Sequence, residues 1–278
     1  MTKPDPGVPP SCLPPEGGRF LFACRCLPIL FLPLLLSGCG DWTPLVPGTP
    51  LGDKHFWVLT AGIQYTLLIS LYAIVFGSII GLAGAMMSRS RFKGVRRAVW
   101  FYVQGFRMVP LFVLLLWIYY ALPIAINELP PEFGELPGMD MLRQMTPFTA
   151  VTIGLSLNAG AFLIEIFRAG MESVSKAQID AGLAFGMSRT LLMRRIILPQ
   201  AVRRMLPPMT SQFISIVKDS SLGGAIGVAE FTRRAILLQT QILHPMEIYT
   251  FLALEYIAVC VMLTLLARYL ERRYPQHN

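Results

Sequence analysis

Long apolar runs, separated by short polar segments, dominate this sequence of 278 residues. A helix needs about 20 mostly apolar residues to cross a bilayer, and several of the runs are about that long. They predict membrane spans over about residues 56–87, 100–122, 147–167, 207–230 and 249–267. The pattern therefore predicts an all-α polytopic membrane protein with five core transmembrane helices.

The composition agrees with a membrane protein and argues against a soluble domain. Hydrophobic residues make up 54% of the chain and charged residues only 14%. The net charge of +8 is the kind of excess that also occurs in nucleic-acid-binding proteins. Here, however, the basic residues lie in short segments beside apolar runs, as the positive-inside rule describes. Membrane orientation accounts for the charge, and no nucleic-acid partner is expected.

The distribution of basic residues also predicts the topology. Residues 88–97, 168–206 and 268–273 are basic and are placed in the cytoplasm, whereas the loop 123–146 is mostly acidic and is placed in the periplasm. The segment 231–247 is an exception, since it has two arginines on the opposite side. The core would begin in the periplasm and end in the cytoplasm of a bacterium, as a multi-pass protein of the inner membrane.

The N-terminal part reads differently from the core. Residues 1–39 start Pro- and Gly-rich and end in a short apolar run whose last residues, LSGC, resemble a bacterial lipoprotein signal. That resemblance would make Cys39 a lipidated N-terminus. The alternatives are an uncleaved signal-anchor, or a start codon placed upstream of the true one. Residues 40–55 are expected to form a periplasmic lead-in, and residues 56–273 the membrane-spanning core.

One polar stretch, residues 172–208, interrupts the apolar pattern. Ser175 and Gln178 have the spacing of a capping box, and Gly186 suits a left-handed helix stop. Ser188 can cap a second helix, predicted to end before Pro199. Two short helices that meet at a glycine make a rigid elbow suited to docking, although an ordinary amphipathic surface helix would show the same periodicity.

The spacing within this stretch resembles the EAA loop of ABC-transporter permease subunits. The residues that carry the spacing are Asp180, Ala181, Gly182, Gly186, Ile196, Leu198 and Pro199. The resemblance implies a cytoplasmic loop that inserts a short coupling helix into a groove of an ATP-hydrolysing subunit. Asp180 stands where Glu is usual and Gly182 where Ala is usual, the latter at a cost of about 1 kcal/mol in helix propensity.

Other segments resemble the polar amino-acid permeases of the same superfamily, of the histidine, glutamine and glutamate type. They are FRMVPL at residues 106–111, GAFLIEIFRAG at 160–170 and KDSSL at 218–222, where the family has KDTSL. The resemblance covers residues 60–273 and implies a type I ABC-importer transmembrane domain. It also implies as partners an ATP-binding subunit, a second permease (a copy or a homologue) and a periplasmic substrate-binding protein.

Charged residues inside predicted spans are expensive and are therefore functional candidates. We expect Lys218, Asp219, Ser220 and Ser221 to line or gate the translocation path; a structural polar knot between helices is the alternative. Glu255, in the middle of the fifth span, is a further candidate that bears on substrate choice.

Two local features of the spans carry structural predictions. Pro110 lacks a backbone N–H and should kink the second span near its start. Glu165 and Arg168 are three residues apart on a helix and are expected to form an ion pair at the cytoplasmic boundary.

Nothing in the sequence indicates chemistry on a substrate. It contains no GxxxxGK[ST] phosphate loop, its histidines are isolated, and its cysteines have no metal-ligand spacing. The chain is therefore expected to bind no cofactor itself and to depend on ATP and Mg²⁺ in a partner. An ion-coupled carrier or channel, or a membrane-anchored scaffold without transport activity, are the competing classes.

Overall fold

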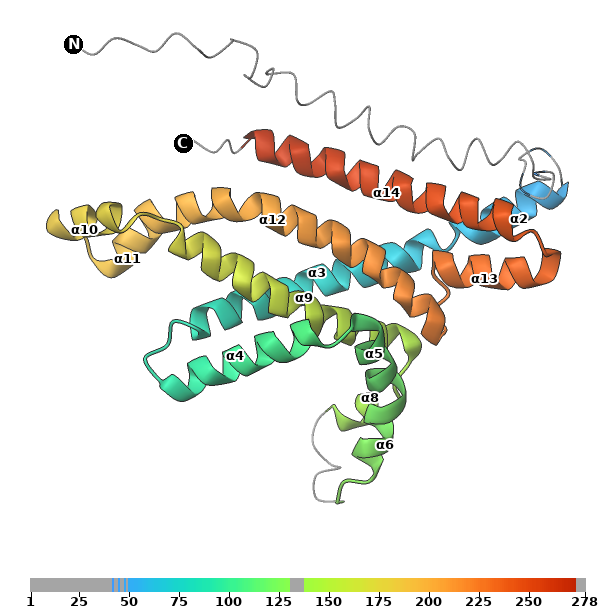
Figure 1. Ribbon diagram of the computed structural model, residues 1–278, viewed down its shortest axis with the longest axis horizontal. Coiled ribbons are helices and arrows are strands. Elements are labelled where there is room, and N and C mark those ends of the chain that lie inside the picture. Colours follow the sequence, from blue (N-terminus) through green and yellow to red (C-terminus); the bar gives the residue numbers. More distant parts are fainter. Residues whose placement is uncertain (1–41, 43–44, 46–47, 49, 131–137, 274–278) are drawn as a thin grey trace, which may run out of the picture.

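The computed structural model of this protein describes residues 42, 45, 48, 50–130 and 138–273 (Figure 1). The signal-like segment predicted over residues 1–39, with Cys39, lies outside the described residues. Within them, the chain is built of helices and connecting turns. The fold is that of an all-α membrane protein, as the sequence predicts.

The described residues form a succession of helices. The first half contains α2 (Pro50–Thr60), α3 (Ile63–Met87), α4 (Lys93–Met108), α5 (Leu111–Leu116), the π-helical turn η2 (Trp117–Ala121), α6 (Leu122–Asn127) and α8 (Met139–Arg143). The second half contains α9 (Pro147–Glu172), α10 (Lys176–Ala184), α11 (Arg189–Leu192), the π-helical turn η3 (Met193–Ile197), α12 (Leu198–Asp219), the 3-10 turn η4 (Ser220–Ile226), α13 (Phe231–Ile242) and α14 (Pro245–Arg273).

Three of the described helical stretches are long and apolar enough to cross a membrane: Gly52–Met87, Pro147–Glu172 and Pro245–Tyr269. They contain the predicted first, third and fifth spans. A bent pair, Lys93–Met108 with Leu111–Asn127, becomes a fourth candidate if it counts as one span. It contains the predicted second span.

The helix at the predicted fourth span, residues 207–230, has other bounds than that span. Helix α12 begins at Leu198 and passes through Pro207 and Pro208, and it ends at Asp219. Proline interrupts the hydrogen bonds of an isolated helix, but neighbouring helices hold such a helix together in a membrane bundle. Here α12 packs against α9 through Ala201 and Met205, which are buried.

Helix α9 is the centre of the fold, lying against α3, α4 and α12 (Figure 1). Its most extensive contact is with α3, along a stripe of small residues on that helix formed by Gly77, Gly81 and Gly84. A Cβ at Gly81 would lie 2.6 Å from the Cβ of Leu163, and one at Gly84 would lie 2.3 Å from the Cδ1 of Ile164. The stripe therefore serves helix packing, because any side chain there would push α3 away from α9.

Helices α4 and α5 meet at a sharp break at Pro110. The two parts of the pair are bent by 104°, so the break is far larger than the predicted kink. Since Pro110 has no N–H, the carbonyl of Phe106 loses its donor within the helix. The side-chain amide of Asn158, on α9, donates to that carbonyl at 3.0 Å. A side chain of the central helix thus replaces the missing backbone hydrogen bond.

This contact predicts a stability effect of Asn158→Leu, which keeps the volume of the side chain and removes its donor. We expect a loss of about 1 kcal/mol, the scale of interhelical hydrogen bonds in membranes, seen as a lower midpoint of thermal unfolding in detergent. Ser156→Ala is the control, because the Ser156 hydroxyl donates to the Thr152 carbonyl of its own helix and not to a neighbouring helix within the described residues. Equal midpoints for the two variants would contradict the assignment.

Candidate functional site: an interhelical elbow and a polar turn

The elbow, residues 173–197, connects α9 to α12 and begins with a capped helix. The hydroxyl of Ser175 accepts from the N–H of Gln178 at 3.4 Å, so Ser175 is the N-cap of α10 as predicted. At the other end Gly186 has φ +75°, and the N–H groups of Gly186 and Met187 donate to the carbonyls of Leu183 and Gly182. These two bonds form a Schellman motif, which confirms the predicted left-handed stop.

The second part of the elbow starts as predicted but does not end where expected. Ser188 caps α11 by accepting from the N–H of Leu191 at 3.3 Å. The chain then continues through η3 directly into α12, so the prediction that this helix ends before Pro199 is wrong. The wider π-turn η3 shifts the hydrogen bonding by one residue just before Pro199, and the proline then occupies the first turn of α12, where it is tolerated.

The elbow has a small hydrophobic core of its own. Val174, Leu192 and Ile197 are buried there, with Ile179 and Ile196 packed against them. Gly182 is buried at the contact between the two arms, and a Cβ at this position would lie 2.5 Å from the Cδ1 of Leu192. The departure from the usual alanine therefore has a local explanation, because Leu192 fills the space that an alanine methyl would occupy.

The outer face of the elbow is exposed. Of the residues that carry the EAA-like spacing, Asp180, Ala181 and Gly186 are exposed on the elbow, and Leu198 and Pro199 are exposed at the start of α12. Phe185 was not singled out from the sequence, yet it is 88% exposed at the tip. Its signal in the sequence is a bulky aromatic residue directly before the stop glycine, where a solvent-facing residue is usually polar.

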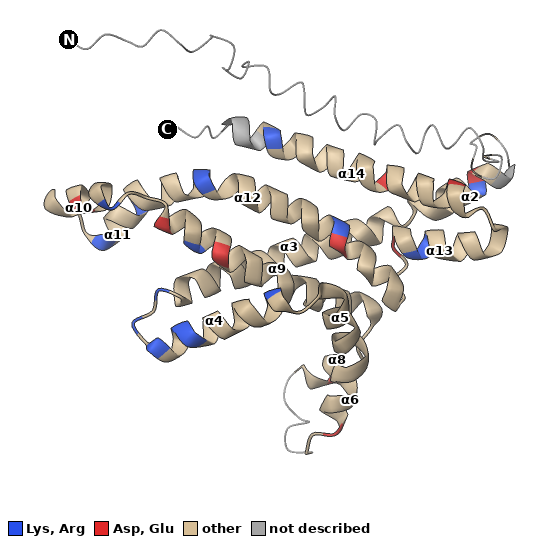
Figure 2. Cartoon of the chain, in the orientation of Figure 1, with Lys and Arg blue, Asp and Glu red and all other residues tan. Residues whose placement is uncertain are grey.

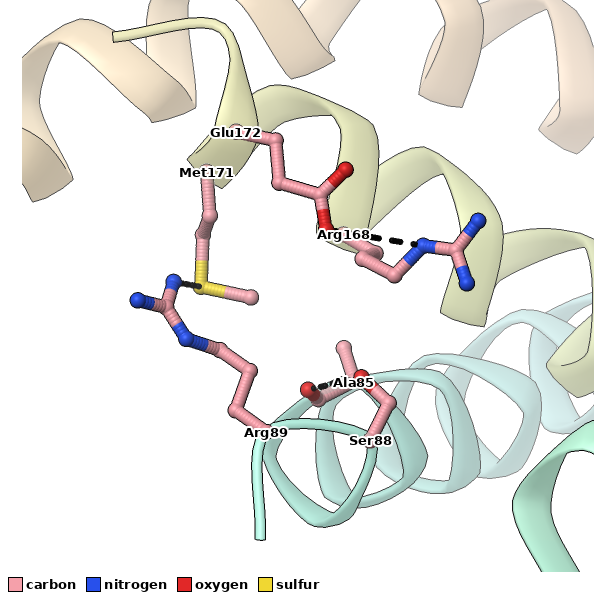
Figure 3. Close-up of polar contacts among 6 residues, drawn as sticks. All are labelled: Ala85, Ser88, Arg89, Arg168, Met171 and Glu172. Carbon is pink, nitrogen blue, oxygen red and sulfur yellow. Dashed lines mark hydrogen bonds and ion pairs between the residues drawn. The ribbon is translucent and has the colours of Figure 1, made fainter. Parts of the chain in front are cut away.

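The base of the elbow is tied to the helices that enter and leave it. Arg204, on α12, donates to the carbonyl of Ser173, and Arg168 pairs with Glu172 at 3.8 Å on α9. Figure 3 shows Arg89, at the end of α3, reaching the sulfur of Met171, with an N···S distance of 3.8 Å. The ends of α3, α9 and α12 therefore meet where the elbow begins.

The predicted ion pair of Glu165 with Arg168 is wrong. Glu165 pairs instead with Arg107, at the end of α4, and the Arg107 guanidinium also lies over the ring of Phe162 with 5.2 Å to its centroid. Arg168 turns toward Glu172, one helical turn later. Spacing along one helix does not reveal a partner from a neighbouring helix, which explains the error.

The polar turn, Lys218–Ser221, lies where α12 changes into η4. Lys218 is exposed, Asp219 is half-buried, and Ser220 is fully buried with its hydroxyl donating to the Val217 carbonyl at 2.8 Å. The regular helix ends at Asp219, and the buried Gly223 and Gly224 follow within the 3-10 turn η4.

Glu255 lies on α14 at the level of the polar turn. Val217 and Val259 share one hydrophobic cluster, which also contacts Tyr256, next to Glu255. Both carboxylate oxygens of Glu255 are buried and have no hydrogen-bond partner within the described part of the chain. A cavity of about 360 Å³ lies nearby between α3, α12 and α14, but apolar side chains such as Leu67, Phe213 and Leu263 line most of it.

Comparison with solved structures defines the class of this protein. The fold matches a protein described as "Crystal structure of an amino acid ABC transporter with histidines", with a TM-score of 0.69 and 30% identity over 80% of this chain and 96% of that one. It also matches the MetNI methionine ABC transporter, with a TM-score of 0.64 and 18% identity over 80% and 99%, which supports the fold alone. The chain is the transmembrane domain of a type I ABC importer.

The family follows from sequence comparison. Residues 73–275 match the family described as "Binding-protein-dependent transport system inner membrane component". The glutamine transport system permease protein GlnP of Escherichia coli (strain K12) is 34% identical over 84% of this chain and 97% of its own length. The L-cystine transport system permease protein TcyB of Bacillus subtilis (strain 168) is 35% identical over 82% and 91%. This chain belongs to that family and is a permease subunit of the inner membrane.

The left-handed conformation of Gly186 predicts that Gly186→Val makes the elbow more susceptible to trypsin. A β-branched residue in the left-handed region costs on the order of 1–2 kcal/mol, so the elbow should open more often and trypsin should cleave after Arg189 about 5- to 30-fold faster. The control is Gly94→Val in α4, where a Cβ meets no atom within 4 Å and φ is not positive. Equal cleavage rates in both variants would show that the left-handed stop does not hold the elbow closed.

Proposed function

We propose that this permease imports polar amino acids or related compounds by alternating access, driven by ATP hydrolysis in a separate subunit. The observation that carries the proposal is the relationship to GlnP over almost the whole length of that protein, supported by the similarity to TcyB and to a solved amino acid ABC transporter. These relatives differ in the compound that their names give, so the class of substrate is proposed and not the individual compound.

We propose that the elbow faces the cytoplasm. Figure 2 shows Lys and Arg gathered at the end of the molecule formed by α10, α11, the start of α4 and the last part of α14. Basic residues favour the cytoplasmic side of an inner membrane, which supports this orientation. The opposite end, with α2 and α13, then faces the periplasm and the substrate-binding protein.

The elbow is proposed to dock into the ATP-binding subunit, which would bind ATP and Mg²⁺. Its N-capped helix α10, its own core and its tie to α12 through Arg204 make it a preformed element. Phe185 is the most exposed large apolar side chain of the described residues. An exposed aromatic residue on a rigid tip has the properties of an interface anchor, so Phe185 is proposed to fill a pocket of the partner.

This role predicts that Phe185→Ala uncouples the transporter. Truncation of an aromatic anchor typically costs 2 kcal/mol or more, so uptake into proteoliposomes holding the full complex should fall by about tenfold or more. Phe92→Ala is the matched control, since Phe92 is 75% exposed in the turn between α3 and α4, outside the elbow. The docking assignment fails if both variants transport at the wild-type rate with equal amounts in the membrane.

The polar turn and Glu255 are proposed to lie along the translocation path, which a second permease would complete. Lys218 is exposed at the end of α12, and the carboxylate of Glu255 is buried without a partner in the described chain. Charges at membrane depth need a protein or water neighbour, and a second copy or a homologue across this face would supply one. The arrangement would place polar groups of two chains around the substrate.

This placement predicts that Lys218→Met, Asp219→Asn and Glu255→Gln each reduce uptake by about tenfold or more, equivalent to about 1.4 kcal/mol. The controls are Lys93→Met and Asp140→Asn, which change exposed charges at the ends of helices. Uptake is measured in membrane vesicles and normalised to the amount of permease. Near-normal uptake by the three variants, at normal membrane levels, would contradict a role in the path.

A further inference from the structure

Glu230 is a buried acid that the predicted path does not include. It is 0% exposed and precedes α13, whose N-cap it is. Its carboxylate accepts from the N–H groups of Thr232 and Arg233 at 2.9 and 2.8 Å, and from the hydroxyl of Tyr256 at 2.8 Å. The first two bonds cap α13, and the third reaches across to α14.

The same carboxylate lies directly against η4. A Cβ at Gly224 would be 2.3 Å from Oε1 of Glu230 and 3.0 Å from the N of Arg233, so only a glycine fits there. Two backbone hydrogen bonds hold the segment between Gly224 and Glu230 in place. The N–H of Val228 donates to the Gly223 carbonyl, and the N–H of Glu230 donates to the Val228 carbonyl. Glu230 therefore contacts three elements at once: η4, α13 and α14.

The packing around this contact extends to the first long helix. A Cβ at Gly62, between α2 and α3, would lie 2.6 Å from the backbone N of Phe231. The ring of Phe231 meets that of Tyr256 edge-on, with 5.4 Å between centroids. The backbone next to Glu230 is packed against Gly62 on one side and against Gly224 on the other. The carboxylate therefore cannot shift without losing one of its hydrogen-bond donors.

The chemistry of the three donors makes the contact specific for a carboxylate. An amide in place of the carboxylate would offer one acceptor and would turn an NH₂ donor toward the remaining N–H or O–H groups. A buried donor that loses its acceptor is costly. Glu230→Gln therefore weakens the contact by more than the loss of one charge would. An aspartate is a good N-cap but its shorter side chain would not reach Tyr256.

We propose that Glu230 is a positioning residue that fixes the polar turn Lys218–Ser221 against α14, so that the turn and Glu255 keep one relative position during transport. The inference rests on the proposed function, in which the polar turn and Glu255 line the path. Its physical basis is independent of the substrate, because it follows from the contacts of Glu230 with Gly224 and Tyr256.

The test measures the position of the turn without measuring transport. Ser221→Cys is introduced into the full complex, with the native cysteines replaced, and its reaction rate with a small thiol reagent is compared between Glu230 and Glu230→Gln backgrounds. We expect the rate to change about fivefold or more, since release of the turn alters how often Ser221, half-buried here, meets solvent. Glu247→Gln is the control: it changes another buried acid, at the start of α14, which faces His244.

Two milder variants keep the test decisive if Glu230→Gln does not accumulate in the membrane. Tyr256→Phe removes one donor and keeps the ring packing, and Glu230→Asp keeps the cap of α13 and loses the bond to α14. Both should shift the reactivity of the cysteine in the same direction, by similar amounts. If Glu230→Asp behaves like the parent while Tyr256→Phe does not, or if no variant changes the rate, Glu230 is only a helix cap and the proposal is overturned.

Uptake measured on the same samples separates this proposal from the proposed function. A changed reaction rate together with lost uptake, at normal membrane levels and with intact ATP hydrolysis, supports both. A changed rate with normal uptake supports the positioning role and removes the polar turn from the path.

Discussion

The backbone polar groups of a membrane helix must find partners within the protein, because hydrocarbon offers none. Two interruptions of the helical hydrogen bonding show how this chain meets that constraint. At Pro110 the carbonyl of Phe106 has no donor within its helix and accepts instead from the side-chain amide of Asn158. At the start of α13 the N–H groups of Thr232 and Arg233 have no acceptor within the helix and donate to the carboxylate of Glu230. Each interruption is repaired by a side chain whose position is fixed by tight packing.

Helix α9 connects the parts of the molecule that function requires. Through its glycine-lined contact with α3 it holds the first long helix, through Glu165 it holds Arg107 at the end of α4, and its last turn leads into the elbow. A movement of the elbow is therefore transmitted first to α9 and to α12, whose Arg204 binds the carbonyl of Ser173. The polar turn lies at the far end of α12, so one helix links the elbow to the proposed path.

The sequence predicts those features that depend on neighbouring residues. The caps at Ser175 and Ser188, the stop at Gly186 and a kink at Pro110 were predicted, because each depends on local backbone chemistry, although the size of the bend at Pro110 was not. The fold class followed from the length of the apolar runs and from the resemblance of several segments.

Contacts between distant segments were not visible in one sequence. The partner of Glu165 comes from α4, and the donor to Glu230 comes from α14, so spacing along one helix pointed to Arg168 and missed Tyr256. The continuation of α12 through Pro199, Pro207 and Pro208 was also missed, because local propensity ends a helix at proline whereas packing in a bundle sustains it.

The space that Leu192 takes beside Gly182 has a mechanical consequence. That contact and the hydrogen bonds of the Schellman motif hold α10 and α11 in one relative position. The elbow therefore has little conformational entropy to lose when a partner binds. A displacement applied at Phe185 would then pass to the base of the elbow as a rotation of one rigid lever. Gly182 lowers the helix propensity of α10, but it admits the Leu192 side chain and thereby makes the elbow rigid.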